Sequence, residues 1–227
     1  MKKISCLICA YNEAPRIEKV LKVAAVHPLV DEVLVVDDGS TDATSAVAKK
    51  VKGVKVVTLK KNCGKTEALR TGLEKVKNEL VLLLDADLLG LHAEDLTALI
   101  HPVLSGKAGM SLSLRKNSFR IHKMLGFDFS SGERVFHKSL LKGHLEKLRR
   151  LPRFGFEVFL NHLFIQTRQV LAVAWWPTVS HVRKSKKMGW LRGQWSEIKM
   201  VLDMARTIGL LKIISQNISL LRLRARY

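Results

Sequence analysis

Cysteine is scarce in this sequence, whose 227 residues contain only Cys6, Cys9 and Cys63. An odd and small number excludes a fold stapled by many disulfides and favours a reducing compartment. Cys6 and Cys9 have the C-x-x-C spacing of redox and metal pairs, but they lie within an apolar run. We therefore interpret them as residues of a buried strand.

Long hydrophobic runs are absent as well. No segment reaches the roughly 18 uninterrupted apolar residues of a membrane span, and the N-terminal segment has no signal-peptide cleavage pattern. We therefore expect a cytoplasmic protein. A hydrophobic content of 47% excludes a disordered chain. Because the sequence shows no repeat and no linker, we expect a single domain over residues 1–227.

Acidic side chains are few, and their distribution is uneven. The chain has 39 Lys and Arg against 20 Asp and Glu, a net charge of +19. Residues 1–100 contain 15 basic and 14 acidic side chains, whereas residues 101–227 contain 24 basic and 6 acidic ones. A basic second half indicates a polyanionic partner, which is a nucleic acid, an anionic membrane surface or a phosphorylated substrate.

Strands and helices alternate four times in the first half. Apolar segments predict strands over 4–10, 32–36, 54–59 and 79–84, and helical spacing or capping residues predict a helix after each. This alternation predicts an α/β fold with a mostly parallel sheet covered by helices. The ligand site of such a fold lies at the carboxyl ends of its strands.

The pattern is less regular after residue 90. The expected elements are helices over 93–104, 119–125, 138–149, 154–166 and 194–207, strands over 109–114 and 169–176, a loop over 130–136 that enters a strand, and a basic loop over 182–192.

Two carboxylates follow the fourth predicted strand. Asp85 and Asp87 stand two residues apart, so both point to the same side of an extended segment and can reach one cation. Oxygen ligands of this kind suit Mg²⁺ or Mn²⁺ shared with substrate phosphates. The alternative interpretation of a lone D-x-D pair is a solvated turn.

Polar residues also follow the other predicted strands. Glu13 could contact a ribose with Tyr11 against a base, or Glu13 could cap the next helix. Asp38 could accept a hydrogen bond from a nucleoside, or form a turn with Asp37. Lys65 stands directly before a helix, and helix N-termini attract phosphate.

Together these four turns resemble those of family 2 glycosyltransferases of the GT-A fold. The motifs that match in order and spacing over residues 3–115 are Ile8-Cys9-Ala10-Tyr11-Asn12-Glu13, Val35-Val36-Asp37-Asp38-Gly39-Ser40-Thr41-Asp42, Asn62-Cys63-Gly64-Lys65 with Ala68-Leu69-Arg70-Thr71-Gly72, and Leu83-Leu84-Asp85-Ala86-Asp87. The resemblance implies a Rossmann-like sheet, a UDP- or GDP-sugar donor and a bound Mg²⁺ or Mn²⁺. The nucleotide-sugar site that it implies consists of Ala10, Tyr11, Glu13, Asp38, Lys65, Asp85 and Ala86, and the metal ligands are Asp87 and Asp85.

The second half resembles the polyprenol-phosphate and dolichol-phosphate sugar transferases more loosely. Ser131-Gly132-Glu133-Arg134 and Gly155-Phe156-Glu157 carry this resemblance. It implies that Arg134 binds an acceptor phosphate, a role that suits a fixed planar charge.

Members of the family usually invert the anomeric centre, which requires a base on the acceptor's side. The resemblance makes Glu133 a candidate base, Glu157 a candidate for orienting the acceptor, and Asp87 catalytic through its metal. Some relatives supply a third metal ligand from the position of His181; the alternative is a loop histidine bonded to backbone.

The C-terminal segment is both apolar and basic. Residues 210–223 run into Arg222, Arg224 and Arg226, which fits a basic helical extension lying on an anionic leaflet. The alternatives are a helix packed on the domain and an oligomer contact. We expect a nucleotide-sugar-binding half, 1–115, and an acceptor-binding half, 116–227, in a protein peripheral to the inner face of the membrane.

These features predict an inverting, metal-dependent glycosyltransferase that moves a sugar from a UDP- or GDP-sugar to a lipid-linked or phosphate-bearing acceptor. One alternative is a glycosyltransferase with a soluble or glycan acceptor in envelope polysaccharide assembly. The other is a basic nucleic-acid-binding protein without enzymatic activity. Because no helix-turn-helix, zinc or RNP pattern occurs, we expect no nucleic-acid partner, and a homo-oligomer is left open.

Overall fold

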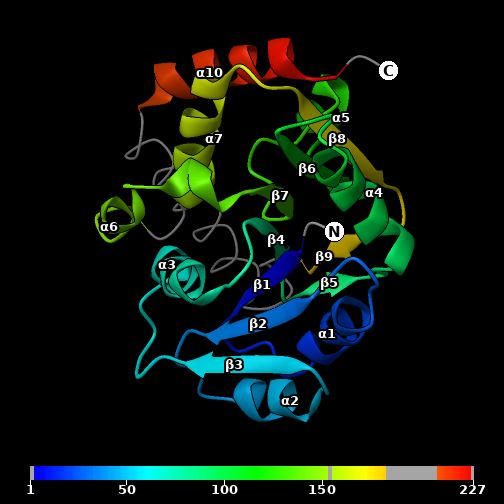
Figure 1. Cartoon of the computed structure of the whole chain (residues 1–227), viewed down its shortest axis with the longest axis vertical. Coiled ribbons are helices and arrows are strands. Elements are labelled where there is room, and N and C mark those ends of the chain that lie inside the picture. Colours follow the sequence, from blue (N-terminus) through cyan, green and yellow to red (C-terminus); the bar gives the residue numbers. More distant parts are fainter. Residues whose placement is uncertain (1–2, 153–154, 183–208, 226–227) are drawn as a thin grey trace.

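The computed structural model describes residues 3–152, 155–182 and 209–225, and a seven-stranded sheet forms its centre (Figure 1). The order of the strands is β3-β2-β1-β4-β7-β6-β8. Their bounds are β1 (Ile4–Ala10), β2 (Glu32–Asp37), β3 (Val54–Thr58), β4 (Leu80–Asp85), β6 (Met110–Arg115), β7 (Arg134–His137) and β8 (Leu171–Trp176). Strands β1 to β4 are parallel, and β8 is parallel to β6. Only β7 in this sheet is antiparallel to its neighbours, β4 and β6, so the prediction of a mostly parallel sheet is confirmed.

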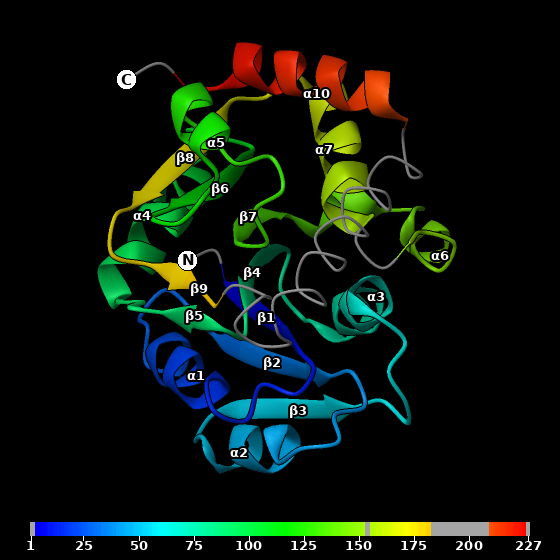
Figure 2. The same cartoon turned by 180° about the vertical axis from the view of Figure 1, so that it is seen from behind.

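Helices cover both faces of the sheet (Figures 1 and 2). They are α1 (Ile17–Ala25), α2 (Thr44–Lys50), α3 (Lys65–Lys75), α4 (Ala93–Leu104), α5 (Arg120–Leu125), η1 (Lys138–Leu141, a 3₁₀ helix), α6 (Leu145–Leu148), α7 (Phe156–Thr167) and α10 (Leu210–Leu223). Helices α1, α2 and α4 bury apolar side chains against one face, and α3, α7 and α10 do so against the other.

Strand β1 shows why both faces need helices. Ile4, Cys6 and Ile8 belong to the apolar cluster on one face, and Leu7 belongs to the cluster on the other. Because successive side chains of a strand point to opposite faces, a strand covered on both faces is apolar at nearly every position. The exception in β1 is Ser5, whose buried hydroxyl donates a hydrogen bond of 2.7 Å to Glu32. Cys6 and Cys9 are free, and burial raises the pKa of both thiols, so the interpretation as strand residues is confirmed.

Gly72 determines how closely α3 approaches the sheet. A Cβ atom at this position would lie 2.3 Å from Cδ1 of Leu7, far inside van der Waals contact. The missing side chain therefore lets α3 pack directly on β1 and fixes the position of its N-terminal residue, Lys65.

One prediction about secondary structure is wrong, and one small sheet was not predicted. Residues 138–149 do not form one helix, because η1 and α6 are separated at Gly143, whose φ is 74°; a left-handed residue cannot continue a right-handed helix. The sequence also gave no sign of a second small sheet, in which β5 (Leu88–Leu89) pairs with β9 (Ser180–His181). Strands of two residues carry no periodic signal. Apart from Val182, the basic loop over 182–192 and the helix over 194–207 lie outside the described residues.

The C-terminal helix α10 packs on the domain along one face. The side-chain amide of Gln216 donates a hydrogen bond of 2.9 Å to the carbonyl of Val158 in α7, and Leu220 is fully buried. The interpretation of a packed helix is thus confirmed for this face. None of the described helices has the length and apolar character that crossing a bilayer demands.

Candidate active site

The loops at the carboxyl ends of β1, β2 and β3 are joined by side-chain hydrogen bonds. The Asn12 N–H donates to Ser40 Oγ at 2.9 Å, and the Asn12 amide oxygen accepts from the Thr41 N–H at 2.9 Å. The two carboxylate oxygens of Asp38 accept from the N–H groups of Cys63 and Gly64, at 2.7 and 2.8 Å. The predicted strand-end residues therefore form one continuous rim.

The predicted nucleotide-binding residues along this rim differ in the exposure and in the partners of their side chains. Tyr11 is exposed, whereas the side chains of Ala10 and Ala86 are buried in the core, so these alanines offer a ligand only their backbone. Glu13 lies 2.6 Å from Nε of Arg16 at the start of α1. This ion pair fits the alternative interpretation of Glu13 as a helix-start carboxylate, and its contact with a ribose stays a prediction.

Lys65 joins the two halves of the chain at the end of β4. Its Nζ lies 2.9 Å from Oδ1 of Asp85 and 2.9 Å from Oε1 of Glu157, in the first turn of α7. Burial by itself would lower the pKa of Lys65, but the two carboxylates outweigh it and raise that pKa. The lysine therefore stays charged at neutral pH and holds the first D-x-D carboxylate against the second half of the chain.

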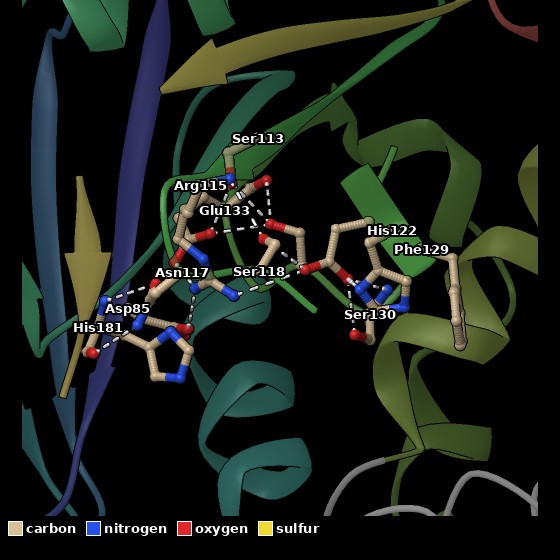
Figure 3. A network of polar contacts seen from close by, with 12 residues as sticks. Asp85, Ser113, Arg115, Asn117, Ser118, His122, Phe129, Ser130, Glu133 and His181 are labelled. Atoms are coloured by element: carbon tan, nitrogen blue, oxygen red, sulfur yellow. Dashed lines mark hydrogen bonds and ion pairs between the residues drawn. The ribbon is translucent and has the colours of Figure 1, made fainter. Parts of the chain in front are cut away.

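Arg115, at the end of β6, is the centre of a buried charge network that the sequence analysis missed (Figure 3). Its Nη1 lies 2.7 Å from Oε1 of Glu133 and 3.7 Å from Oδ2 of Asp85, and its Nη2 lies 3.8 Å from Oδ2 of Asp128. Burial would raise the pKa of Asp85, but the charges of Lys65 and Arg115 lower it. The sequence offered one signal for Arg115, which is its position. It stands at the end of a predicted strand, as do the site candidates in the first half of the chain.

Glu133 is fully buried within this network. Its Oε2 accepts hydrogen bonds from the hydroxyls of Ser113 and Ser131, at 2.7 and 2.8 Å. Burial raises the pKa of Glu133, the Asp85 charge adds to this rise, and the Arg115 charge opposes it. Both carboxylate oxygens already have partners, which does not favour the predicted role as a base.

The surroundings of Arg134 do not favour its predicted role. It is fully buried and donates to the carbonyls of Ser131 and Phe129 and, at 3.1 Å, to the side-chain oxygen of Asn161. Its guanidinium therefore donates to protein acceptors. The geometry supports a role in fixing the 129–131 loop and does not support the predicted contact with an acceptor phosphate.

The small second sheet brings His181 to the D-x-D turn. His181 pairs with Leu88, the residue after Asp87, and Asn117 holds its backbone through hydrogen bonds of 2.9 and 3.3 Å. Burial and then the Arg115 charge lower the pKa of His181, whereas Asp87 and Asp85 act against this. The imidazole is therefore neutral near pH 7, the form that binds a metal.

The predicted metal ligands Asp85, Asp87 and His181 are only partly arranged to bind a cation. Among the described residues, no group of three or more His, Cys, Asp or Glu side chains surrounds a common point as a metal site does. Asp85 is turned to Lys65, while Nδ1 of His181 is buried and makes no hydrogen bond in the described structure. The carboxylate of Asp87 and Nδ1 of His181 are both kinds of ligand that a cation such as Mn²⁺ binds.

Comparison with protein families gives a clear match. The model of the family described as "Glycosyl transferase family 2" matches residues 5–152. Among curated proteins, the dodecaprenyl-phosphate galacturonate synthase of Rhizobium johnstonii is 28% identical over 51% of this chain and 36% of its own length. The human dolichyl-phosphate beta-glucosyltransferase is 37% identical over 38% of this chain and 31% of its own length. The chain thus spans about a third of the length of these relatives.

The fold also matches solved structures. Glucosyl-3-phosphoglycerate synthase from Mycobacterium tuberculosis, in complex with Mn²⁺, UDP-glucose and phosphoglyceric acid, superposes with a TM-score of 0.69 at 22% identity. The match covers 91% of this chain and 79% of that one. It shows a shared GT-A fold, which agrees with the predicted fold class.

Proposed function

We propose, because the chain belongs to glycosyl transferase family 2, that it transfers a sugar from a nucleoside diphosphate sugar to a phosphate-bearing acceptor. The observation that carries this proposal is the Lys65 contact with Asp85 and Glu157. It joins the D-x-D end of the nucleotide half to the part of the chain expected to bind the acceptor. Family membership leaves no support for the interpretation as a nucleic-acid-binding protein without activity.

The donor site in this proposal is the rim from β1 to β4. Asp38 keeps the 62–64 loop in place through its two backbone hydrogen bonds, and the exposed ring of Tyr11 is available to a base. Lys65, at the N-terminus of α3, supplies a positive charge for the diphosphate. We favour uridine over guanosine because the M. tuberculosis neighbour binds UDP-glucose.

Asp87 and His181 would hold the divalent cation, with Asp85 joining them if the donor draws Lys65 away from it. When bound, Mg²⁺ or Mn²⁺ supplies positive charge that stabilises the leaving diphosphate. The chain's own contribution is to keep the imidazole of His181 neutral and its backbone fixed through Asn117.

The acceptor in this proposal is a lipid phosphate. A phosphate oxygen is already ionised at neutral pH, so its attack on the sugar needs no protein base. This agrees with Glu133, whose oxygens are taken up by Arg115, Ser113 and Ser131. The names of two curated relatives refer to dodecaprenyl-phosphate and dolichyl-phosphate. No contact in the described residues favours a glycan acceptor instead.

Calorimetric titration with UDP and GDP, each with and without Mn²⁺, tests the proposal. We expect one nucleotide, UDP, to bind in the micromolar range only with Mn²⁺, and Asp87→Asn to weaken that binding at least tenfold, about 1.4 kcal/mol. Glu94→Gln, which changes an exposed carboxylate on α4, serves as the matched control and should bind as the wild type does. Folded protein that binds neither nucleotide would contradict the proposal.

A further inference from the structure

Exposed apolar side chains gather on two helices that lie outside the candidate active site. In the described part of the chain, eleven large apolar side chains are exposed, and six of them lie on α10, on α5 or at the residue that precedes α5. These six, the α5–α10 surface, are Phe119, Ile121, Met124, Leu211, Ile214 and Ile218. Met124 and Leu211 are each 83% exposed. Such a concentration marks an interaction site in a folded protein.

The two helices lie next to each other and are fixed to each other at the C-terminal end of α10. Nη1 of Arg224, directly after α10, donates a hydrogen bond of 2.6 Å to the carbonyl of Leu125, the last residue of α5. Both views show α5 beside the C-terminal end of α10, at one end of the molecule (Figures 1 and 2). The inner face of α10 is anchored to α7 by Gln216, so the outer face keeps its apolar side chains in solvent.

The spacing on α10 is that of an amphipathic helix. Leu211, Ile214 and Ile218 stand three and four residues apart, which places them on one side, away from the buried Leu220. These three side chains stay exposed in the described part of the chain, while the opposite face of the helix is packed on the domain. This stripe is therefore available to an apolar phase.

Charge identifies the partner. Neither α5 nor α10 contains an acidic residue, and the exposed cations beside the apolar stripe are Arg120, Lys123, Lys212 and Arg222. Apolar side chains flanked by cations alone complement a lipid leaflet with anionic headgroups. A protein partner would need a surface that is both apolar and uniformly acidic.

Helix α5 also contacts the active-site network on its inner side. Nδ1 of His122 lies 3.0 Å from Oδ1 of Asp128, and the same carboxylate contacts Arg115 and accepts a hydrogen bond of 3.0 Å from Ser118 Oγ (Figure 3). We propose that the α5–α10 surface docks on an anionic membrane leaflet and so brings a lipid-phosphate acceptor to the site behind α5. The acceptor part of this inference rests on the proposed function, whereas the docking itself does not.

Sedimentation with vesicles of phosphatidylcholine, with and without phosphatidylglycerol, tests the docking. We expect the full chain to bind the anionic vesicles and to be released by salt. Met124→Ser combined with Ile214→Ser should lower the partition coefficient at least tenfold, because two large side chains no longer enter the lipid. Val26→Ser is the matched control, since Val26 is 80% exposed but follows α1. Lys123→Gln combined with Arg222→Gln should weaken binding about fivefold per charge, and only to anionic vesicles.

The outcomes separate docking from catalysis. Wild-type protein that binds UDP but not the vesicles overturns the docking and leaves the proposed function standing. Protein that binds the vesicles but no nucleotide overturns the proposed function and leaves the docking standing. Equal vesicle binding by the Met124 and Ile214 double variant overturns the docking surface. Loss of a dimer in that variant, measured by light scattering, would show that a second copy of the chain covers the surface, which also overturns the proposal.

Discussion

The backbone at Gly132 lies directly against the carboxylate of Asp85. A Cβ atom at position 132 would lie 2.5 Å from Oδ1 and 2.6 Å from Oδ2, distances that real Cβ atoms do not reach. The loop before β7 therefore packs onto the end of β4 only because residue 132 has no side chain. Through this contact a residue of the second half limits where the first D-x-D carboxylate can lie.

Gly132→Ala should disturb Asp85 more than the fold. The added methyl group must displace the carboxylate or the loop, at a cost of about 1–3 kcal/mol in unfolding free energy, and UDP affinity should fall at least tenfold. Calorimetry and thermal unfolding measure the two effects. Gly53→Ala is the control, because Gly53 has φ 83° and no atom within 4 Å of a Cβ; it should cost about 1–2 kcal/mol of backbone strain and leave UDP affinity intact. Normal UDP binding by Gly132→Ala would contradict the relationship.

Glu133→Gln distinguishes a phosphate acceptor from a hydroxyl acceptor. With a lipid phosphate, we expect turnover within about tenfold of the wild type, because the attacking oxygen is already ionised. Removal of a general base would instead lower turnover about 10²–10⁴-fold. The measurement is turnover per folded protein, with folding checked by thermal unfolding because Arg115 loses a charged partner. A loss in the larger range would identify Glu133 as the base and refute our assignment.

Arg134→Met should affect stability and not acceptor binding. The substitution leaves the buried carbonyl of Ser131 and the side-chain oxygen of Asn161 without the donor that Arg134 supplies, which should lower the unfolding free energy by about 3 kcal/mol. The carbonyl of Phe129 keeps its hydrogen bond of 2.9 Å from the Asn161 amide. The KM for the acceptor should be unchanged in the protein that folds. Arg149→Met, at a largely exposed arginine, is the control and should unfold at the wild-type temperature. A stable Arg134→Met variant with a raised acceptor KM would restore the phosphate-binding role.

Asp128 should make the protein sensitive to acid. Burial would raise the pKa of Asp128, but the hydrogen bond and charge of His122 and the charge of Arg115 lower it. The unfolded chain then binds a proton near pH 3.9, whereas the folded chain binds it only at lower pH. Stability from this carboxylate is thus fully present above about pH 5 and decreases as the pH falls towards the folded pKa.

The test compares urea unfolding of the wild type and Asp128→Asn from pH 6 to pH 3. The wild type should lose about 1 kcal/mol more than the variant over this range. A difference that does not change with pH would show that the network does not hold Asp128 ionised.

The local pattern predicted the first half of the molecule well, for a physical reason. Strands such as β1 and β4 are buried on both faces and therefore appear as nearly continuous apolar runs. Parallel strands bring their carboxyl ends to one edge, so Asp38, Lys65 and Asp85 were recognisable as one rim from their places in the chain. The expected helix over 93–104 agrees with the bounds of α4. The hydrogen bonds between the loops, such as the one from the Gly64 N–H to Asp38, could not be predicted from the sequence.

By itself, then, the sequence determined the α/β alternation, the polar rim and the basic second half, because each depends on neighbours along the chain. Tertiary structure alone decided which distant residues meet that rim. Strand β7 runs antiparallel between β4 and β6, which brings Glu133 and Arg115 to Asp85 and turns Arg134 into the interior. The two-residue pairing of β5 with β9 brings His181 beside the D-x-D turn. These contacts join residues about 20 to 100 positions apart, and no local periodicity encodes a contact over such a separation.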